Sequence, residues 1–369
     1  MDYFFWNWDP VLFKLGNLVF TWYAFYAILS FVLSVYFIRK LFTKKDVHIY
    51  RIDLFIIFIT VISLIFARIG SVLANPIVDK NESFLSYVLP LSFNPAIHFV
   101  GLHHLSLPFG ILGLLFASWS YNKIVRGGPV FRIWDAVAIL ACLVGALFFK
   151  ADFLHSTYLG TPSGGPDGTV SIRPVYDGLK KLSCCIMRNP DGPNPLTKIL
   201  IKKGNQRMNK EPNLKNMDFL IDFKPGIEER EASEFVIGDI KTYLYEHPVY
   251  VSESGKEPIN YSLTKLPAGH IQGKITTLGI ARHPVAAYLT LFLFLMAVFF
   301  YFFERKNRAP GFITAWILIL FSVFYFLIQF ITLQPTQEKT MAGLWTSQWC
   351  ILPVFLFGWI IYFSKAKKA

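Results

Sequence analysis

Seven long apolar stretches dominate this sequence and restrict the folds that are open to it. Hydrophobic residues make up 54% and aromatic residues 17% of the 369 residues, a combination that soluble proteins seldom reach. A helix needs about 20 mainly apolar residues to cross the hydrocarbon core of a bilayer. The stretches that meet this condition run at about 18–38, 54–75, 106–122, 131–153, 285–303, 312–332 and 345–363. The sequence therefore predicts a polytopic α-helical membrane protein with about seven transmembrane helices.

The distribution of basic residues predicts the orientation of these spans. Lysine and arginine gather between spans one and two, three and four, and five and six, and again after span seven. Short loops rich in these residues stay in the cytoplasm, so we expect the N-terminus outside and the C-terminus in the cytoplasm. The formal net charge of +12 then favours contact with anionic membrane lipid, and we expect no nucleic-acid partner.

A long, mostly polar segment at 154–283 separates spans four and five. The predicted orientation places this segment outside, because long loops cross the membrane largely regardless of their charge. We expect a small extracytoplasmic α+β head domain here, inserted between membrane parts at 1–153 and 284–369.

Local patterns within the predicted head indicate individual elements. Turn residues fill 160–168, and 169–175 is strand-like. Met217 to Phe223 alternates as a half-buried strand does, Glu228 to Glu246 has the pattern of an amphipathic helix, and 249–251 would form a following strand. The apolar face of the predicted helix consists of Ala232, Phe235, Val236, Ile240 and Leu244.

Two arginines at the membrane are the leading candidates for a binding site. Arg68 lies inside span two, where a charge is costly and usually functional. Its fork of N–H donors suits a lipid phosphate, whereas the alternative is that it extends its charged end to the headgroups. Arg282 and His283 stand before Pro284, where the polar segment ends and span five begins. Arg282 would be either an interfacial anchor or a second phosphate-binding cation at the same depth as Arg68.

Further titratable residues lie at the ends of spans three and four. Lys150 and Asp152 would pair with each other, or Lys150 would face a lipid headgroup; an interfacial pair at a helix end is equally open. His103 and His104 would supply a base near neutral pH or act as amphipathic anchors. Asp135 is expected to open span four as a charge at a helix N-terminus.

Ser106 and Pro108 suit the cap and first turn of span three. Trp22, Tyr23 and Tyr26 form either an aromatic belt or a set in which a tyrosine hydroxyl faces a lipid cavity. The four cysteines lack metal-ligand spacing, so no metal site is expected.

Several segments occur in the order found in one bacterial enzyme family. Asp9 to Gly16 followed by Trp22-Tyr23, Ala67-Arg68-Ile69-Gly70, Arg282-His283-Pro284 with Tyr288, and Gln334-Pro335 are similar to its signatures. The chain therefore resembles the prolipoprotein diacylglyceryl transferases. The seven spans, the outside N-terminus and a head between spans four and five also resemble that family, although this head is larger than usual.

The resemblance implies a multi-pass protein of the bacterial cytoplasmic (inner) membrane. Its activity would be transfer of a diacylglyceryl group from phosphatidylglycerol to the lipobox cysteine of a prolipoprotein, without a metal or cofactor. Partners would be phosphatidylglycerol, the prolipoprotein and membrane lipid. Arg68 and Arg282 would bind the lipid phosphate. The remaining roles would fall to Tyr23, Lys150, His103 and His104 as catalytic residues, and to Asp152, His283 and Tyr288 as supporting residues.

The chain departs from the family pattern at several polar positions. The family has a histidine where Pro108 stands, and another where Thr21 stands. Charged or polar family residues are replaced by Phe149, Phe321, Tyr325 and Gln329. These replacements leave a second function open, in which the fold binds lipid or lipoprotein without transfer.

Overall fold

The computed structural model describes thirteen segments of the chain, which form two compact units. The described residues are 4–15, 18–44, 52–74, 91–92, 98–99, 106–125, 130–165, 168–182, 195–204, 211–266, 270–304, 309–333 and 343–366. The first unit, called the sheet unit below, combines Met1–Trp22 with Asp152–Ala286. The second, the helical unit, combines Tyr23–Ala151 with Ala287–Ala369. The domain boundaries expected from hydropathy, 1–153, 154–283 and 284–369, stay a prediction.

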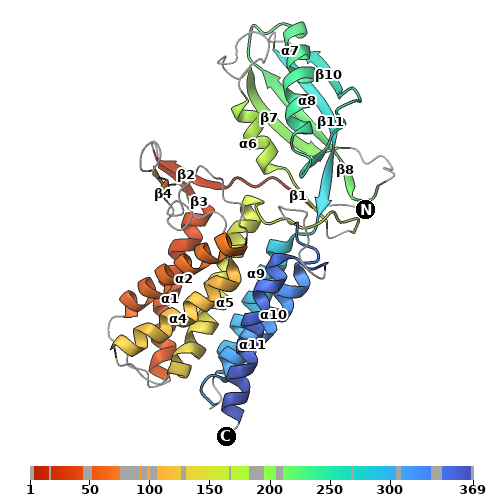
Figure 1. Ribbon diagram of the computed structural model, residues 1–369. Coiled ribbons are helices and arrows are strands. Elements are labelled where there is room, and N and C mark those ends of the chain that lie inside the picture. Colours follow the sequence, from red (N-terminus) through yellow and green to blue (C-terminus); the bar gives the residue numbers. More distant parts are fainter. Residues whose placement is uncertain are drawn as a thin grey trace. The chain divides into compact units, whose positions relative to one another are not determined.

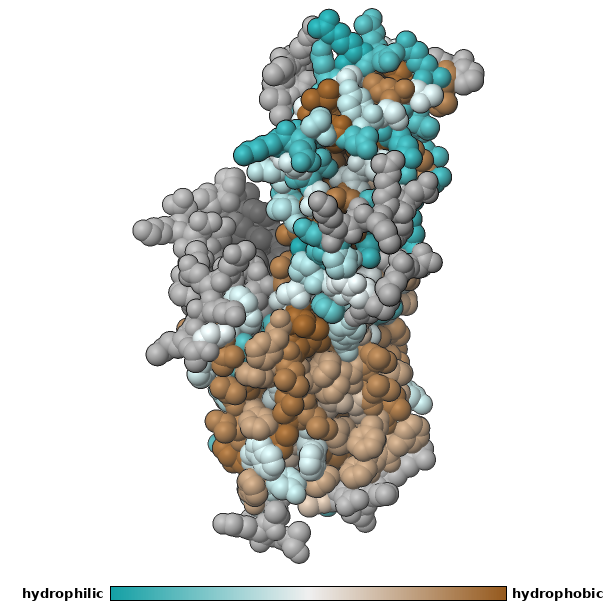
Figure 2. Space-filling view, turned by 90° about the vertical axis from the view of Figure 1, so that its right-hand side faces the viewer, coloured by the Kyte–Doolittle hydropathy of each residue, from teal (hydrophilic) through white to brown (hydrophobic). Residues whose placement is uncertain are grey.

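Long apolar helices make up the helical unit (Figure 1). They are α1 (Trp22–Lys44), α2 (Ile52–Ala74), α4 (Leu107–Val125), α5 (Val130–His155), α9 (Val285–Phe303), α10 (Phe312–Ile328) and α11 (Thr346–Ala366). Among the described residues, five helices are long and apolar enough to cross a membrane: α1, α2, α5, α9 and α11. Figure 2 shows hydrophobic side chains covering the helices on the side in view. The chain is thus a protein with transmembrane helices, and the count of seven stays a prediction.

The first span begins later than the predicted start at about residue 18. Residues Leu18–Thr21 form strand β3, which pairs antiparallel with β2 (Val11–Leu15). Trp22 then starts α1, and two hydrogen bonds hold it there. Its backbone N–H donates to the Pro10 carbonyl at 3.1 Å and its indole Nε1–H donates to the Asp9 carbonyl at 3.0 Å. The short hairpin therefore determines where the helix begins.

Asp135 has a different role from the one expected of it. It lies inside α5, beyond the first turn, and only 3% of it is exposed. Its carboxylate accepts hydrogen bonds from the Gly311 N–H at 2.8 Å, the Thr314 N–H at 2.9 Å and the Thr314 hydroxyl at 2.8 Å. These donors open α10, whose N-cap Gly311 has a φ of 91°, a conformation that favours glycine. The prediction that Asp135 serves its own helix terminus is wrong, because it caps a neighbouring helix.

A mixed sheet forms the centre of the sheet unit (Figure 1). Its strand order is β1-β6-β11-β8-β7, with β9 and β10 also pairing with β11. Only β1 and β6 are parallel, and the other pairs are antiparallel. The strands are β1 (Phe4–Trp6), β6 (Thr169–Ser171), β7 (Leu196–Lys203), β8 (Leu214–Phe223), β9 (Val251–Ser252), β10 (Asn260–Lys265) and β11 (Ile271–Arg282). In the helical unit, β4 (Leu91–Ser92) pairs antiparallel with β5 (His98–Phe99).

The helices of the sheet unit confirm one prediction and correct another. The expected helix is present as three consecutive pieces, α7 (Glu229–Phe235), the π-helical η1 (Val236–Ile240) and α8 (Lys241–Tyr245), and all five residues of its predicted apolar face are buried. The strand expected over 169–175 is wrong in its second half, because α6 (Arg173–Lys181) starts there with proline in its first turn. The predicted strand from Met217 is confirmed within β8.

The C-terminal end of α5 is fixed to the sheet by a serine pair. Ser156 has a φ of 58°, which is unusual for a residue other than glycine, and it is 3% exposed. Its hydroxyl forms a hydrogen bond with the hydroxyl of Ser171 in β6. The Thr157 N–H donates to the Asp152 carbonyl at 3.2 Å, which closes the last turn. These contacts hold the end of α5 against the strand.

Candidate functional site

Arg68 lies in a part of α2 whose neighbouring residues pack closely against α4. A Cβ added to Gly70 would lie 2.1 Å from the ring of Phe109, and Gly110 approaches within 3.3 Å of Ala67 when a Cβ is added to it. The Ser106 N–H donates to the Ala67 carbonyl at 2.9 Å, which joins the start of α4 to the same turn of α2. Glycine after Arg68-Ile69 therefore lets α4 pack closely against this part of α2.

Arg68 itself is 8% exposed. An arginine that extends to the headgroups keeps its charged end in water. The low exposure of Arg68 differs from that arrangement. A charge inside an apolar helical unit is costly and is usually retained for binding or pairing. Arg68 is thus more buried than an interfacial anchor whose charged end lies in water, and its role in binding stays a prediction.

Three other predicted residues, Tyr23, Lys150 and Asp152, lie near the ends of α1 and α5. Tyr23 is the second residue of α1, is half-buried, and its ring centroid lies 5.9 Å from that of Phe148 in α5. Lys150 is also half-buried, in the last turns of α5. Asp152 accepts a hydrogen bond from the Thr157 hydroxyl at 2.9 Å. Its carboxylate therefore helps to close α5.

The guanidinium of Arg282 is buried in the sheet unit. Its Nε donates to the Val249 carbonyl at 2.7 Å and its Nη1 donates to the Gly160 carbonyl at 3.1 Å. The residue is 6% exposed, and burial lowers the pKa of Arg282 while the nearby Tyr250 acts in the opposite direction. Burial likewise raises the pKa of Tyr250, and Arg282 partly offsets this effect. Two of the five guanidinium N–H donors thus form hydrogen bonds with backbone carbonyls, and these bonds fix the plane of the group.

The backbone around Arg282 is held by the turn-rich segment that follows α5. The Gly160 N–H donates to the His283 carbonyl at 3.0 Å, and the His283 N–H donates to the Thr161 carbonyl at 3.1 Å. Thr169 of β6 donates its hydroxyl to the Arg282 carbonyl at 3.2 Å. The motif residues therefore sit in an extended segment that is hydrogen-bonded along its length.

The remaining motif residues have simpler positions. Pro284 lies directly before Val285, the first residue of α9, as its lack of an N–H predicts. Tyr288 lies one turn into α9, in the helical unit, and is half-buried. His103, His104 and the Gln334-Pro335 pair lie outside the described residues.

Comparison with known proteins identifies the family. The family model for prolipoprotein diacylglyceryl transferase matches residues 10–364. The chain belongs to the prolipoprotein diacylglyceryl transferase family.

Two curated relatives are similar to part of the chain. A phosphatidylglycerol–prolipoprotein diacylglyceryl transferase of Tolumonas auensis is 25% identical over 169 residues, which are 46% of this chain and 62% of the relative. A protein of the same name from Porphyromonas gingivalis is 26% identical over 170 residues, 46% of this chain and 56% of the relative. The chain thus matches about three fifths of the length of these relatives.

Neutral side chains occupy positions where resemblance to the diacylglyceryl transferase family implies charged or polar groups. Phe321, Tyr325 and Gln329 recur every four residues on one face of α10, with exposures of 5%, 7% and 1%. The first two rings lie 5.6 Å apart, and Gln329 accepts a hydrogen bond from the Ser347 hydroxyl at 3.0 Å. Phe149 of α5 is 6% exposed. This family member therefore buries aromatic and amide groups there.

Sequence reasoning missed three polar contacts, one of Gln348 and two of Arg173. Gln348 of α11 is fully buried and donates from Nε2 to the Phe326 carbonyl of α10 at 3.2 Å. Arg173 forms an ion pair with Asp9 at 3.0 Å and another with Asp177 at 3.0 Å. A glutamine within an apolar span was a usable signal for the first. The pair of Arg173 with Asp9 joins residues far apart in sequence and left no local signal. Arg173 and Asp177 stand four residues apart, a spacing that favours an ion pair on a helix.

Proposed function

We propose that this protein transfers a diacylglyceryl group from phosphatidylglycerol to the thiol of a prolipoprotein's lipobox cysteine. The observation that carries the proposal is the family match over residues 10–364, which includes parts of both units. The names of the two relatives support the same lipid donor and the same protein acceptor. The reaction would take place at the outer face of the bacterial cytoplasmic membrane, with the N-terminus outside and the C-terminus inside.

The chemistry requires a base and positive charge. The base removes the thiol proton, and the sulfur then attacks the glyceryl carbon that carries the phosphate ester. That carbon–oxygen bond breaks, a thioether forms, and glycerol phosphate leaves with the bonding electron pair. A base within hydrogen-bond reach assists the first event, and fixed cations stabilise the departing phosphate.

Arg68 and Arg282 are the proposed phosphate-binding residues. The burial of Arg68 in glycine-packed surroundings supports this role, because a desolvated cation interacts strongly with an anion. The two carbonyl contacts of Arg282 support it as well, because a guanidinium held in one plane presents its other donors in a fixed direction.

The other roles follow from chemistry at the same sites. Tyr23 would orient the lipid headgroup, and Lys150 or one of His103 and His104 would supply the base or the missing charge. Asp152 would be a supporting residue through its hold on the end of α5. His283 and Tyr288 would support Arg282 from the adjoining residues, and the polar part of the sheet unit would recognise the incoming prolipoprotein.

A second candidate function is binding of lipid or lipoprotein without transfer. The buried side chains Phe149 and Tyr325 favour it, because they stand where the resemblance implies arginines and neither carries a positive charge. Losing one preorganised charge-stabilising group costs roughly 10²–10³ in rate. Two uncompensated losses would leave little activity.

A transfer assay separates the two functions. The purified chain in detergent receives phosphatidylglycerol and a lipobox peptide, and mass spectrometry measures the diacylglyceryl mass gain. We expect a gain that Arg68→Gln abolishes, whereas Arg230→Gln, which changes an exposed arginine of α7, leaves it intact. No gain beside an active standard family member would refute transfer and leave the binding function as the candidate to test. Full activity in both Lys150→Ala and His104→Ala would refute the proposed base.

A further inference from the structure

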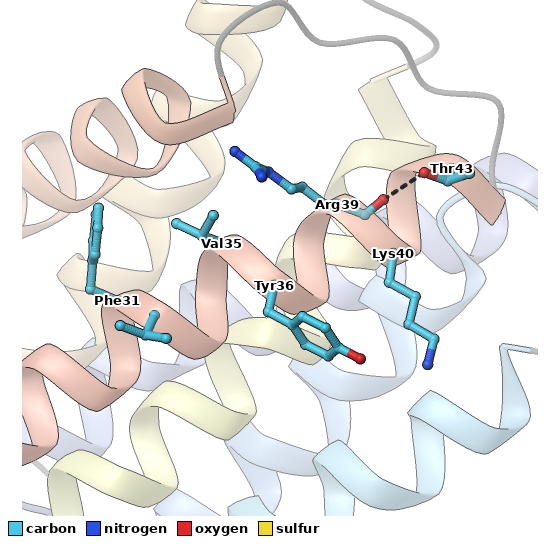
Figure 3. Close-up of a pocket in the computed structure, with 7 residues that line it drawn as sticks. Phe31, Val35, Tyr36, Arg39, Lys40 and Thr43 are labelled. Atoms are coloured by element: carbon cyan, nitrogen blue, oxygen red, sulfur yellow. Dashed lines mark hydrogen bonds between the residues drawn. The ribbon is translucent and has the colours of Figure 1, made fainter.

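A groove of about 600 Å³ runs along α1 towards its C-terminal end (Figure 3). Its walls are two ridges of side chains spaced four residues apart, an arrangement that places each row on one side of a helix. One ridge consists of Phe31, Val35 and Arg39, and the other consists of Val32, Tyr36 and Lys40. The groove is open, since Val32 is 56% and Tyr36 is 59% exposed.

The lining changes from apolar to basic along the helix axis. Phe31, Val32 and Val35 form the apolar part, and Arg39 and Lys40 form the basic end. Eight residues separate Val32 from Lys40, or roughly 12 Å at a rise of 1.5 Å per residue. That distance is close to the half-thickness of a hydrocarbon core, about 15 Å. The groove thus has the polarity of one bilayer leaflet, from acyl chains to headgroups.

At the basic end, an aromatic ring lies beside the Lys40 ammonium, and a hydrogen bond holds the backbone at Arg39. The Lys40 ammonium lies 6.0 Å from the centre of the Tyr301 ring of α9, and Phe37 packs edge-on against the same ring at 5.8 Å. Thr43 donates its hydroxyl to the Arg39 carbonyl at 2.9 Å. Figure 3 shows the Arg39 and Lys40 side chains leaving the helix on different sides. An anionic group at the groove's end would therefore lie between two cations.

We propose that this groove binds an anionic phospholipid, with one acyl chain along the apolar ridges and the phosphate between Arg39 and Lys40. Charge complementarity selects this occupant, because two cations beside a membrane favour lipids with net negative charge. The proposal is independent of the transfer reaction. Tyr23 lies sixteen residues before Arg39 on the same helix, roughly 24 Å away. The bound lipid thus belongs to the opposite leaflet from the proposed donor.

Native mass spectrometry of the full chain tests this site. Wild-type protein is equilibrated with phosphatidylglycerol and with zwitterionic phosphatidylethanolamine, and the lipids retained per chain are counted. We expect one phosphatidylglycerol with a preference of roughly tenfold or more for the anionic lipid, from about fivefold per cation. Arg39→Gln/Lys40→Gln should lose this lipid. Lys202→Gln/Lys203→Gln, which removes two exposed charges from β7, should retain it.

A second pair of variants tests the groove without changing charge. Val32→Trp fills the apolar part, and Ile28→Trp adds the same ring at a site that is 56% exposed but outside the lining. We expect only Val32→Trp to lose the lipid. Equal retention in wild type, Arg39→Gln/Lys40→Gln and Val32→Trp would overturn the proposal, as would equal retention of the zwitterionic lipid. A dimer that these variants dissociate would also overturn it, since the face would then join two copies.

Discussion

Removing the Asp135 carboxylate should destabilise the helical unit more than any other single acidic substitution in its described part. Asp135 accepts three hydrogen bonds at 2.8–2.9 Å from donors at the start of α10. Asp135→Ala leaves the Gly311 and Thr314 N–H groups without an acceptor in a site that is 3% exposed. The Thr314 hydroxyl can turn towards a carbonyl of its own helix, so two orphaned donors determine the cost.

Each buried donor left unsatisfied costs about 1–3 kcal/mol, so Asp135→Ala should lower the free energy of unfolding by about 2–6 kcal/mol. Asp135→Asn keeps one oxygen for Thr314 but turns an amide N–H₂ towards the Gly311 N–H. The free energy of unfolding of that variant should fall by about 1–3 kcal/mol, the value for one unsatisfied donor. Thr314→Val removes only the hydroxyl bond and should cost about 1 kcal/mol.

Unfolding in mixed detergent micelles, followed by circular dichroism against the mole fraction of sodium dodecyl sulfate, measures these differences. Asp53→Ala is the matched control, because Asp53 is an exposed acidic residue in the first turn of α2. The expected order of stability is wild type and Asp53→Ala, then Thr314→Val, Asp135→Asn and Asp135→Ala. If Asp135→Ala unfolds at the same mole fraction of sodium dodecyl sulfate as Asp53→Ala, the Asp135 carboxylate does not stabilise α10 and the reasoning fails.

Three further predictions concern other contacts. Gly70→Ala should reduce transfer while Arg68 is intact, because the new Cβ would lie 2.1 Å from the Phe109 ring. Partial recovery of transfer in Gly70→Ala/Phe109→Ala would support this cause. Undiminished transfer in Gly70→Ala would contradict the prediction. Burial raises the pKa of Tyr243 to about 12 from 10.0, so its contribution to stability is complete below pH 10 and is lost as pH rises to about 12. The difference in free energy of unfolding between wild type and Tyr243→Phe should therefore change with pH mainly within that window. Arg173→Gln should speed amide hydrogen exchange in β1, because the ion pair with Asp9 is lost; unchanged exchange there would count against the pair.

Local patterns predicted the elements whose stability is local. A helix with one apolar stripe shows its period in sequence, so the buried face containing Phe235 and Leu244 was recognisable from the order of its residues alone. The same holds for the alternation in β8 and for the length of the apolar helices. The strand expected to reach Val175 failed because alternation continues into α6, where Pro174 in the first turn was the competing signal.

Tertiary contacts of the site were beyond the reach of sequence patterns. Motif resemblance located Arg68 and Arg282, but it gave no partner for either. The carbonyl of Gly160 binds Arg282 across 122 positions of sequence, and a backbone oxygen has no residue-type signature. Asp135 shows the same difficulty, because a carboxylate near a helix start suggests its own helix, whereas the donors it binds lie 176 and 179 positions later.

The pairing of β1 with β6, and of β6 with β11, has a consequence for synthesis of the chain. Trp6 is synthesised well before its partner strand, which ends at Ser171, and that strand in turn pairs with Arg282. At 5–20 residues per second, roughly 14–55 s pass between the synthesis of residues 6 and 282. Among the described strands, β1 can pair only with β6 before β11 is complete, and no further strand lies beside that pair. Completion of the sheet is therefore a late event in biogenesis, and a chain stalled before residue 282 would expose the β1–β6 pair to proteases.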